Sequence, residues 1–188
     1  MEHVPLVPAA SARRAPTWDV AMWLGTPSPL ESLGGKVVVL HAFQMLCPGC
    51  VAHGLPQAAG IFRSFDRMDV AVVGLHTVFE HHDAMRPVSL TAFLHEYRVP
   101  FPVGVDAHTP GDPVPRTMAA YGLRGTPSLV LIDRRGRLRA NLFGRPSDLA
   151  VGAAVASLVA EGASRDRGAS PAASDCDDEG CTVPPRVG

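Results

Sequence analysis

Residues 37–50 of the chain are VVVLHAFQMLCPGC, and their order predicts how the fold is organised. The run Val37–Phe43 is almost entirely apolar and rich in β-branched residues, which is typical of a strand buried on both faces of a parallel sheet. Apolar residues then recur at helical spacing from Val51 to Phe65, with a kink expected at Pro56. The motif Cys47-Pro48-Gly49-Cys50 therefore lies between a buried strand and the start of a helix.

Strands and helices are expected to alternate along the rest of the chain. The patterns predict strands at 70–75, 101–105, 128–132 and 137–143, and helices at 89–97, 118–123 and 148–160. Residues 133–136 are expected to form a hairpin turn between the last two strands. A strand, a crossover helix and a second parallel strand favour a sheet with helices on both faces. The fold class is therefore α/β, with a central mixed sheet flanked by helices.

Composition divides the chain into three parts. Residues 1–16 are rich in Pro, Ala and Arg and are expected to form a flexible arm. Residues 17–160 form the expected domain, which is long enough for one well-buried core. Residues 161–188 are dominated by Gly, Ala, Ser, Asp and Arg, so we interpret them as a flexible tail that carries Cys176 and Cys181.

Charge and hydropathy exclude several classes of partner. With 17 Lys and Arg against 18 Asp and Glu, the net charge of -1 gives no general attraction for nucleic acid or anionic lipid. No apolar run approaches the ~18 residues of a membrane helix. A basic start followed by an apolar stretch, as in a signal peptide, is also missing. We therefore expect a cytoplasmic protein with no membrane partner, in a compartment where structural disulfides are rare.

Three further motifs accompany the two cysteines. They are Phe101-Pro102-Val103-Gly104-Val105-Asp106, Gly125-Thr126-Pro127-Ser128 and Leu131-Ile132-Asp133-Arg134-Arg135-Gly136. With these motifs the chain resembles the thioredoxin superfamily, and within it the TlpA-like and redoxin branch, which is related to AhpC/TSA proteins. The resemblance covers about residues 17–160 and implies a thioredoxin-like fold with an inserted helix and strand. The chain departs from the family at Leu46, where Trp is usual, at His41, where thioredoxin has a buried Asp, and at Pro56, which comes one residue later.

The position of the cysteines suits thiol–disulfide exchange. Only a thiolate attacks a disulfide, and free N–H groups and the dipole at a helix N-terminus stabilise a thiolate. Cys47 is expected there, and Pro48 fits the first helical position because its missing N–H costs little. We therefore expect Cys47 to attack and Cys50 to resolve the mixed disulfide. A zinc-binding or inert cysteine pair is the structural alternative.

Several residues are expected to contact the substrate. The resemblance implies that the Thr126–Pro127 peptide is cis, which lets the Thr126 backbone face a bound peptide. Pro48 and Gly49 separate the two cysteines and are assigned to the same surface. His76 ends a strand at the same sheet edge as Cys47 and is expected to border the site.

Other histidines raise two hypotheses. A buried His41 behind the dithiol would accept the proton that Cys50 must lose, tuning the site without supplying the nucleophile. The alternative is a core histidine whose ring nitrogens have backbone partners. His53, His76, His81 and His82 suggest a metal cluster, but their spacing matches no standard ligand motif, so we expect no metal.

Three functions remain open. The leading one is reduction of protein disulfides through Cys47 and Cys50, without a cofactor, on a disulfide-containing protein or small thiol, with an upstream thiol reductant. The second is a peroxiredoxin-type thiol peroxidase, although its Pro-x-x-x-Thr-x-x-Cys pattern is replaced by Leu40 and Gln44 and the matching Arg124 is out of register. The third is a metal-binding protein that uses all four cysteines.

The tail cysteines are candidates for a redox shuttle. Cys176 and Cys181 could exchange with the Cys47–Cys50 pair, because four residues between them form a loop that a disulfide can close. Asp175, Asp177, Asp178 and Glu179 surround them, and clustered negative charge raises the pKa of a thiol. A pair without a role, or a metal clip, is the alternative.

Overall fold

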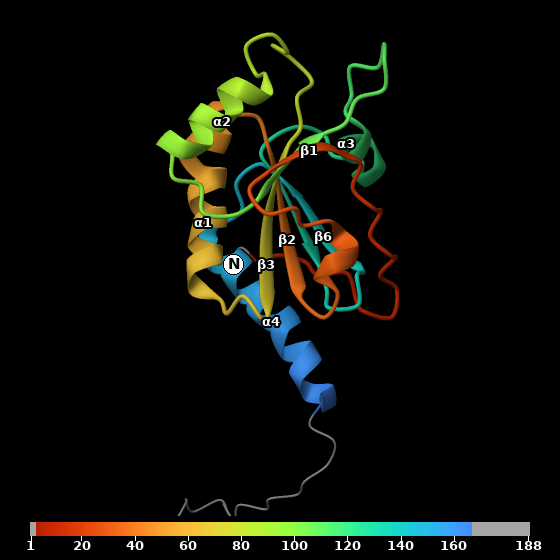
Figure 1. Cartoon of the computed structure of the whole chain (residues 1–188). Helices are drawn as coiled ribbons and strands as arrows, with labels where there is room; N and C mark the ends of the chain where they lie inside the picture. Colours follow the sequence, from red (N-terminus) through yellow and green to blue (C-terminus); the bar gives the residue numbers. More distant parts are fainter. Residues whose placement is uncertain (1–2, 167–188) are drawn as a thin grey trace, which may run out of the picture.

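The computed structural model describes the backbone of residues 3–166 and the side chains of residues 3–162. Within these residues, six strands form one sheet in the order β1-β4-β3-β2-β5-β6 (Figure 1). The strands are β1 (Val20–Leu24), β2 (Val37–Phe43), β3 (Val70–His76), β4 (Val103–Asp106), β5 (Ser128–Ile132) and β6 (Leu138–Phe143). β2 pairs in parallel with β3 and antiparallel with β5, so the sheet is mixed, as predicted.

Helices cover both faces of this sheet. They are the short 3-10 helix η1 (Leu30–Leu33), the π-helical segment η2 (Cys50–Gly54), α1 (Leu55–Ser64), α2 (Pro87–Glu96), α3 (Arg116–Tyr121) and α4 (Asp148–Asp166). Along β2, Val39 and Phe43 face the core built with α1, α2 and α4, whereas Leu40 and Ala42 face the core built with α3. Figure 1 shows α1 and α3 on opposite sides of the sheet. Within residues 3–166, no helix combines the length and apolar character needed to cross a membrane.

The inserted helix and strand expected from the resemblance are present as α2 and β4, with bounds shifted by one or two residues. β1 was not predicted. It is a five-residue strand at the edge of the sheet, where it pairs antiparallel with β4. Its five residues, VAMWL, are all apolar, so the sequence lacks the alternation of apolar and polar side chains that marks a half-buried strand.

The prediction of a loose N-terminal arm is wrong for residues 3–16, which lie along β6. Val7 N donates to the Arg139 carbonyl at 2.8 Å, and Leu138 N donates to the Arg13 carbonyl at 2.9 Å. An edge strand presents unpaired backbone groups, and this segment supplies partners for them. Backbone pairing of this kind leaves no signature in the composition, which is why Pro, Ala and Arg suggested an arm.

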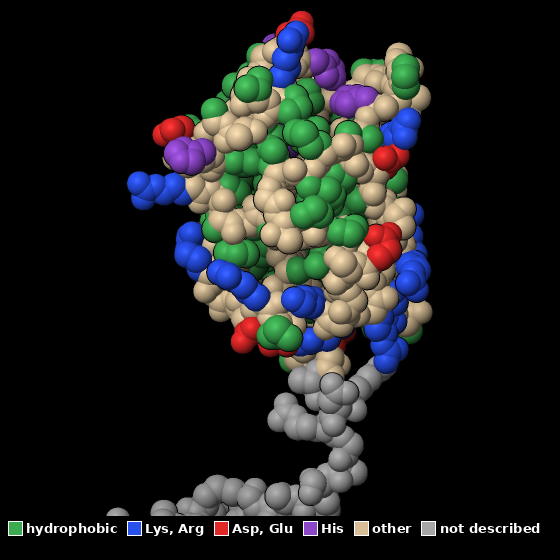
Figure 2. All heavy atoms as spheres, viewed as in Figure 1, with side chains coloured by type: hydrophobic (Ala, Val, Ile, Leu, Met, Phe, Trp, Pro, Cys, Tyr) green, Lys and Arg blue, Asp and Glu red, His purple; other side chains and the backbone are tan. Residues whose placement is uncertain are grey.

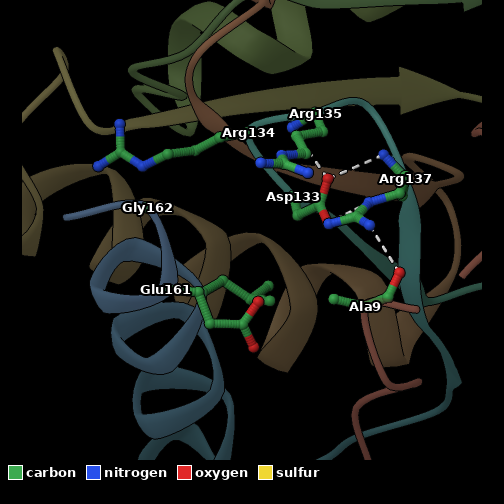
Figure 3. A pocket seen from close by; sticks show the side chains of 8 residues that line it. Ala9, Asp133, Arg134, Arg135, Arg137, Glu161 and Gly162 are labelled. Atoms are coloured by element: carbon green, nitrogen blue, oxygen red, sulfur yellow. Dashed lines mark hydrogen bonds and ion pairs between the residues drawn. The ribbon is translucent and has the colours of Figure 1, made fainter. Parts of the chain in front are cut away.

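The last helix also extends further than expected. α4 continues to Asp166, so the first residues assigned to the tail are helical, whereas Cys176 and Cys181 lie outside the described residues. The buried Arg139 joins α4 to β6, because it donates to both carboxylate oxygens of Glu161 at 2.5 and 2.9 Å. Asp133 lies among the neighbouring arginines and pairs with Arg137 (Figure 3). These ion pairs occupy the end of the molecule where the β5–β6 hairpin meets α4.

Candidate active site

The two cysteines follow β2 where the chain turns from the sheet into a helix. The backbone is helical from Pro48, and Val51 N donates to the Cys47 carbonyl at 3.1 Å. Cys47 therefore lies at the helix N-terminus, as predicted, and both thiols are free. Cys47 is partly exposed, whereas Cys50 is fully buried.

The environments of the two sulfurs differ. Cys47 Sγ accepts a hydrogen bond from Cys50 N at 3.4 Å and approaches the Thr126 carbonyl at 3.5 Å. Partial burial raises the pKa of Cys47, but hydrogen bonds from the Cys50 thiol, the Cys50 backbone N–H and the Thr126 side chain outweigh it and hold that pKa below its usual value. Burial, aided by a hydrogen bond to Cys47, raises the pKa of Cys50 to about 12. The site therefore favours a thiolate at Cys47 and a thiol at Cys50.

A π-helical segment follows the cysteines. In η2, Leu55 N donates to the Cys50 carbonyl, five residues back instead of four. A π segment accommodates one extra residue in a helix. Pro56, which follows as the second residue of α1, comes one residue later than in the family pattern, and η2 accounts for that shift without a break in the helix.

Pro127 packs against two glycines of the dithiol helix. The Thr126–Pro127 peptide bond is cis, as predicted. A Cβ placed on Gly49 would lie 3.3 Å from Pro127 Cδ, and one on Gly54 would lie 3.1 Å from Pro127 Cβ. The missing side chains therefore let the helix approach the proline loop closely. Gly49, which the sequence assigned to substrate binding, packs on Pro127, and its contact with a substrate stays a prediction.

His41 is buried beneath the same helix. A Cβ on Gly54 would lie 2.8 Å from His41 Nε2, and the imidazole stacks parallel to Phe43 with ring centroids 5.8 Å apart. Among the described residues, neither ring nitrogen has a hydrogen-bond partner. Burial lowers the pKa of His41 to about 4, so taking a proton from Cys50 is strongly unfavourable. These contacts favour a positioning residue over the proton acceptor expected from the sequence.

His76 does not border the site as expected. Its side chain ends β3 and is only 1% exposed, so it cannot reach a substrate. His76 Nε2 accepts a hydrogen bond from Met45 N at 3.4 Å, and burial lowers its pKa to about 4. This neutral ring holds the loop that leads to Cys47.

Cys47 opens into a cleft of about 450 Å³. Three segments form its walls: the loop around Cys47 and Pro48, the loop after β3, and the segment from Arg124 to Thr126 together with the end of β6. Four apolar side chains line it, from Leu46, Phe79, Met85 and Phe143, and its charged members include Glu80 and Arg124. Sequence reasoning assigned neither Phe79 nor Phe143 to the site, because they are far from the cysteines along the chain. No pattern in the sequence marks Phe143, and its exposure becomes visible only in the structure, where the side chain is 50% exposed.

The remaining histidines do not converge. His81 lines the cleft, whereas His82 contacts His108 edge to face, with ring centroids 5.3 Å apart. On the face drawn in Figure 2, histidine side chains lie near the top of the molecule and at its left edge. In the part of the chain that the structure describes, no group of three or more His, Cys, Asp or Glu side chains could hold a metal ion. The suggested histidine cluster is therefore not formed.

Comparison with known proteins agrees with this geometry. The family model described as the AhpC/TSA family matches residues 12–141. The chain belongs to the AhpC/TSA family. Its family, together with a 49% identical solved structure named as a thiol-disulfide isomerase, identifies it as a thiol–disulfide oxidoreductase.

Solved structures similar to this AhpC/TSA-family chain share its fold. A thioredoxin-like superfamily protein is 55% identical, with a TM-score of 0.75, over 85% of this chain and 100% of that chain. A thiol-disulfide isomerase from Corynebacterium glutamicum is 49% identical, with a TM-score of 0.74, over 77% of this chain and 96% of that chain. The thiol:disulfide interchange protein DsbE from Chlorobium tepidum, at 22% identity and a TM-score of 0.60 over 80% of this chain and 96% of that chain, shows the fold alone. No curated protein matches the chain.

Within the AhpC/TSA family, Gln44 argues against the peroxidase alternative. Its buried amide occupies the position of the peroxidatic Thr and faces the loop after β3. Gln44 Nε2 donates to Glu80, and Gln44 Oε1 accepts from Phe79 N, both at 3.2 Å. The amide is therefore engaged on both sides and does not turn toward a peroxide at Cys47.

Substitution of two glycines tests the close packing of the helix. We expect Gly54→Ala to destabilise the protein by about 1–3 kcal/mol, because its Cβ would overlap His41 and press on Pro127. Gly60→Ala in α1 is the matched control. Its Cβ would meet open space, so the gain in helix propensity should stabilise the protein by about 0.5–1 kcal/mol. Urea denaturation measures both, and a change of the same sign in the two variants would contradict the packing described.

The buried histidines predict how stability depends on pH. His41 and His76 stay neutral in the fold until about pH 4, whereas in the unfolded chain they take up protons below about 6.5. Their contribution to the free energy of unfolding is therefore complete above about pH 6.5 and is lost as the pH falls toward 4. His41→Leu and His76→Leu should each flatten this decline, measured by urea denaturation across that range.

The same two variants should differ at pH 7. His41→Leu leaves no hydrogen-bonding group unpaired, so its free energy of unfolding should change by about 1 kcal/mol or less. His76→Leu leaves Met45 N without its acceptor and should cost about 1–3 kcal/mol. Equal losses at pH 7 would show that the hydrogen bond from Met45 contributes nothing.

Proposed function

We propose that this thiol–disulfide oxidoreductase is a protein disulfide reductase that transfers two electrons from the Cys47–Cys50 dithiol to a substrate disulfide. The asymmetry of the two thiols carries the proposal. Cys47 is partly exposed in a cleft with a lowered pKa, whereas Cys50 is buried with a raised pKa. The name of the 49% identical relative, a thiol-disulfide isomerase, supports exchange between a dithiol and a disulfide.

The reaction proceeds in two exchanges. The Cys47 thiolate attacks one sulfur of the substrate disulfide, the substrate S–S bond breaks, and the leaving thiolate takes a proton from solvent. Cys50 then attacks the Cys47 sulfur of the mixed disulfide and gives up its proton to water or to the second leaving thiolate. The products are a Cys47–Cys50 disulfide and a substrate dithiol, so two electrons have passed to the substrate.

The cleft suits a peptide chain better than a very small disulfide. Leu46 and Phe143 are 53% and 50% exposed on its rim, although both are large and apolar. Exposed apolar side chains around a reactive group mark a contact surface for another protein. Thr126 presents its backbone beside Cys47, where an extended substrate segment can form main-chain hydrogen bonds.

Catalytic turnover requires that the oxidised protein be reduced again. An upstream thiol reductant, small or protein-borne, reverses the two exchanges on the Cys47–Cys50 disulfide and supplies the electrons. This chemistry requires no cofactor. We propose that the protein works in a reducing cytoplasm, where thiol reductants are present.

Removal of the resolving cysteine should trap the substrate. In Cys50→Ser, the mixed disulfide on Cys47 has no internal thiol to attack it, so covalent adducts with an oxidised protein substrate should accumulate. Cys47→Ser is the control and should form none, because the Cys50 thiol is buried and remains protonated. Non-reducing electrophoresis with mass spectrometry of the adducts measures both. Adducts on Cys50 would reverse the assignment of the two roles.

The role of His41 can be tested in the second exchange. If His41 only positions the helix, His41→Leu should resolve the mixed disulfide at a rate within about threefold of the unsubstituted protein. General base catalysis by a side chain is worth about 10²–10⁴ in rate, so a loss of that size would restore the proton-acceptor role. Rapid quenching with an alkylating reagent, repeated from pH 6 to 9, separates this step from the first attack.

A further inference from the structure

A second cavity adjoins the Cys47 cleft. It has a volume of about 360 Å³ and lies between the end of β6, the start of α4 and the N-terminal segment. Arg124 and Phe143 line both cavities, so the two hollows share one wall. Arg124 precedes Thr126 by two residues, and Thr126 contacts the Cys47 sulfur. A substrate segment that leaves Cys47 along the proline loop therefore meets this cavity within a few residues.

The second cavity carries positive charge. Its lining includes Arg124, Arg145 and His3, and none of its described lining residues is acidic. Within residues 3–162, neither arginine has an ion-pair partner. The guanidinium carbon of Arg124 lies 5.3 Å from the centroid of the Phe143 ring, which holds it on the shared wall. Both arginines are exposed and free to bind an anion.

The arginines at the other end of the molecule are different. Arg137 pairs with Asp133 (Figure 3). Arg139 also pairs with Asp133 and binds Glu161 through two hydrogen bonds. Arg137 lines a separate cavity together with Asp133, Arg134 and Arg135. Carboxylates of the chain pair with Arg134 and Arg137, which leaves Arg135 as the one lining arginine without an ion pair among the described residues. Beside the cleft, by contrast, both arginines are without an ion pair in the described part of the chain, and they adjoin the Cys47 cleft.

The opposite lip of the Cys47 cleft is negative. Glu80 lines it and is held by the Gln44 side chain at 3.2 Å. Charge thus changes sign across the cleft, from Glu80 on one lip to Arg124 and Arg145 on the other. Such a gradient orients a charged peptide and discriminates against the opposite charge.

We propose that Arg124 and Arg145 select disulfide peptides whose cysteine is flanked by acidic residues. This inference rests on the proposed reductase function and names its substrate class. The reaction is the same two-electron exchange: the dithiol of Cys47 and Cys50 becomes a disulfide, and the acidic peptide disulfide becomes a dithiol. The carboxylates stay unchanged and serve only to hold the peptide beside Arg124 and Arg145.

The test compares two peptides that differ only in charge. The acidic probe is a synthetic peptide with the sequence of residues 173–183, ASDCDDEGCTV, oxidised to an internal disulfide. The neutral probe has Asn and Gln in place of its four acidic residues. The reduced full-length protein is mixed with each peptide, and the rate constants are divided by those for dithiothreitol. This division removes the effect of charge on the intrinsic reactivity of the disulfide.

For the unsubstituted protein we expect the acidic peptide to react about tenfold faster, because two exposed ion pairs of up to ~1 kcal/mol each are gained. The ratio of the normalised rate constants, acidic over neutral peptide, should fall toward one in 1 M salt because salt screens exposed ion pairs. It should fall in the same way in the double variant Arg124→Gln/Arg145→Gln. Arg63→Gln, an exposed arginine on α1, is the matched control and should keep the tenfold ratio. Any general effect of a substitution on folding or on Cys47 affects both peptides alike and leaves the ratio unchanged.

Two failures are distinguishable. If the unsubstituted protein reduces both peptides at equal normalised rates, or if the double variant keeps the preference, selection by Arg124 and Arg145 is overturned and the reductase function stands. If it reduces neither peptide and also fails to reduce bis(2-hydroxyethyl) disulfide, the proposed function itself is overturned.

Discussion

The contact between the dithiol helix and the loop of Pro127 constrains the rest of the active site. Gly49 and Gly54 leave room for the proline ring, and Gly54 also lies directly over the imidazole of His41. The chain reaches this arrangement with one residue more than the family pattern, and the π-helical turn of η2 accommodates it before α1 begins. The approach of helix and loop brings the Thr126 backbone to within 3.5 Å of the Cys47 sulfur. Substrate surface and nucleophile are therefore fixed by one packing contact.

The same contact separates the two thiols chemically. Cys47 ends at the cleft, where hydrogen bonds to its sulfur favour the thiolate. Cys50 is one helical turn further along and is enclosed by the core beneath η2, where burial disfavours the charged form. The two cysteines therefore favour opposite protonation states, because one lies at the surface and the other is buried. His41 and His76, both neutral and buried, support this layer by packing and by one hydrogen bond to the Cys47 loop, without carrying charge into it.

The residues that could be predicted are those whose signal is local. Three local patterns were enough to predict the structure around them. The apolar run Val37–Phe43 predicted the strand, the dithiol after it predicted the helix start, and the Thr-Pro dipeptide predicted the cis bond. The residues that sequence reasoning misassigned depend on distant partners. His76 belongs to a strand that ends at the right edge, but its ring turns inward to Met45. Phe143 joins the cleft from the end of β6 and Glu80 from the loop after β3. Residues 3–16 pair with the edge of β6, so in neither case could a local pattern show the partner.

Membership of the AhpC/TSA family does not by itself fix the reaction, because one fold supports several chemistries. In this chain the decisive positions surround Cys47. Gln44 replaces the hydroxyl that a peroxidase would use, and both ends of its amide are bound to the loop after β3. Arg124 lies on the cleft rim against Phe143 and outside the core. A cation held against Phe143 on the rim is placed to meet the side chain of a bound peptide. The features that weaken the peroxidase alternative are therefore the same ones that leave charge available for recognising a disulfide substrate.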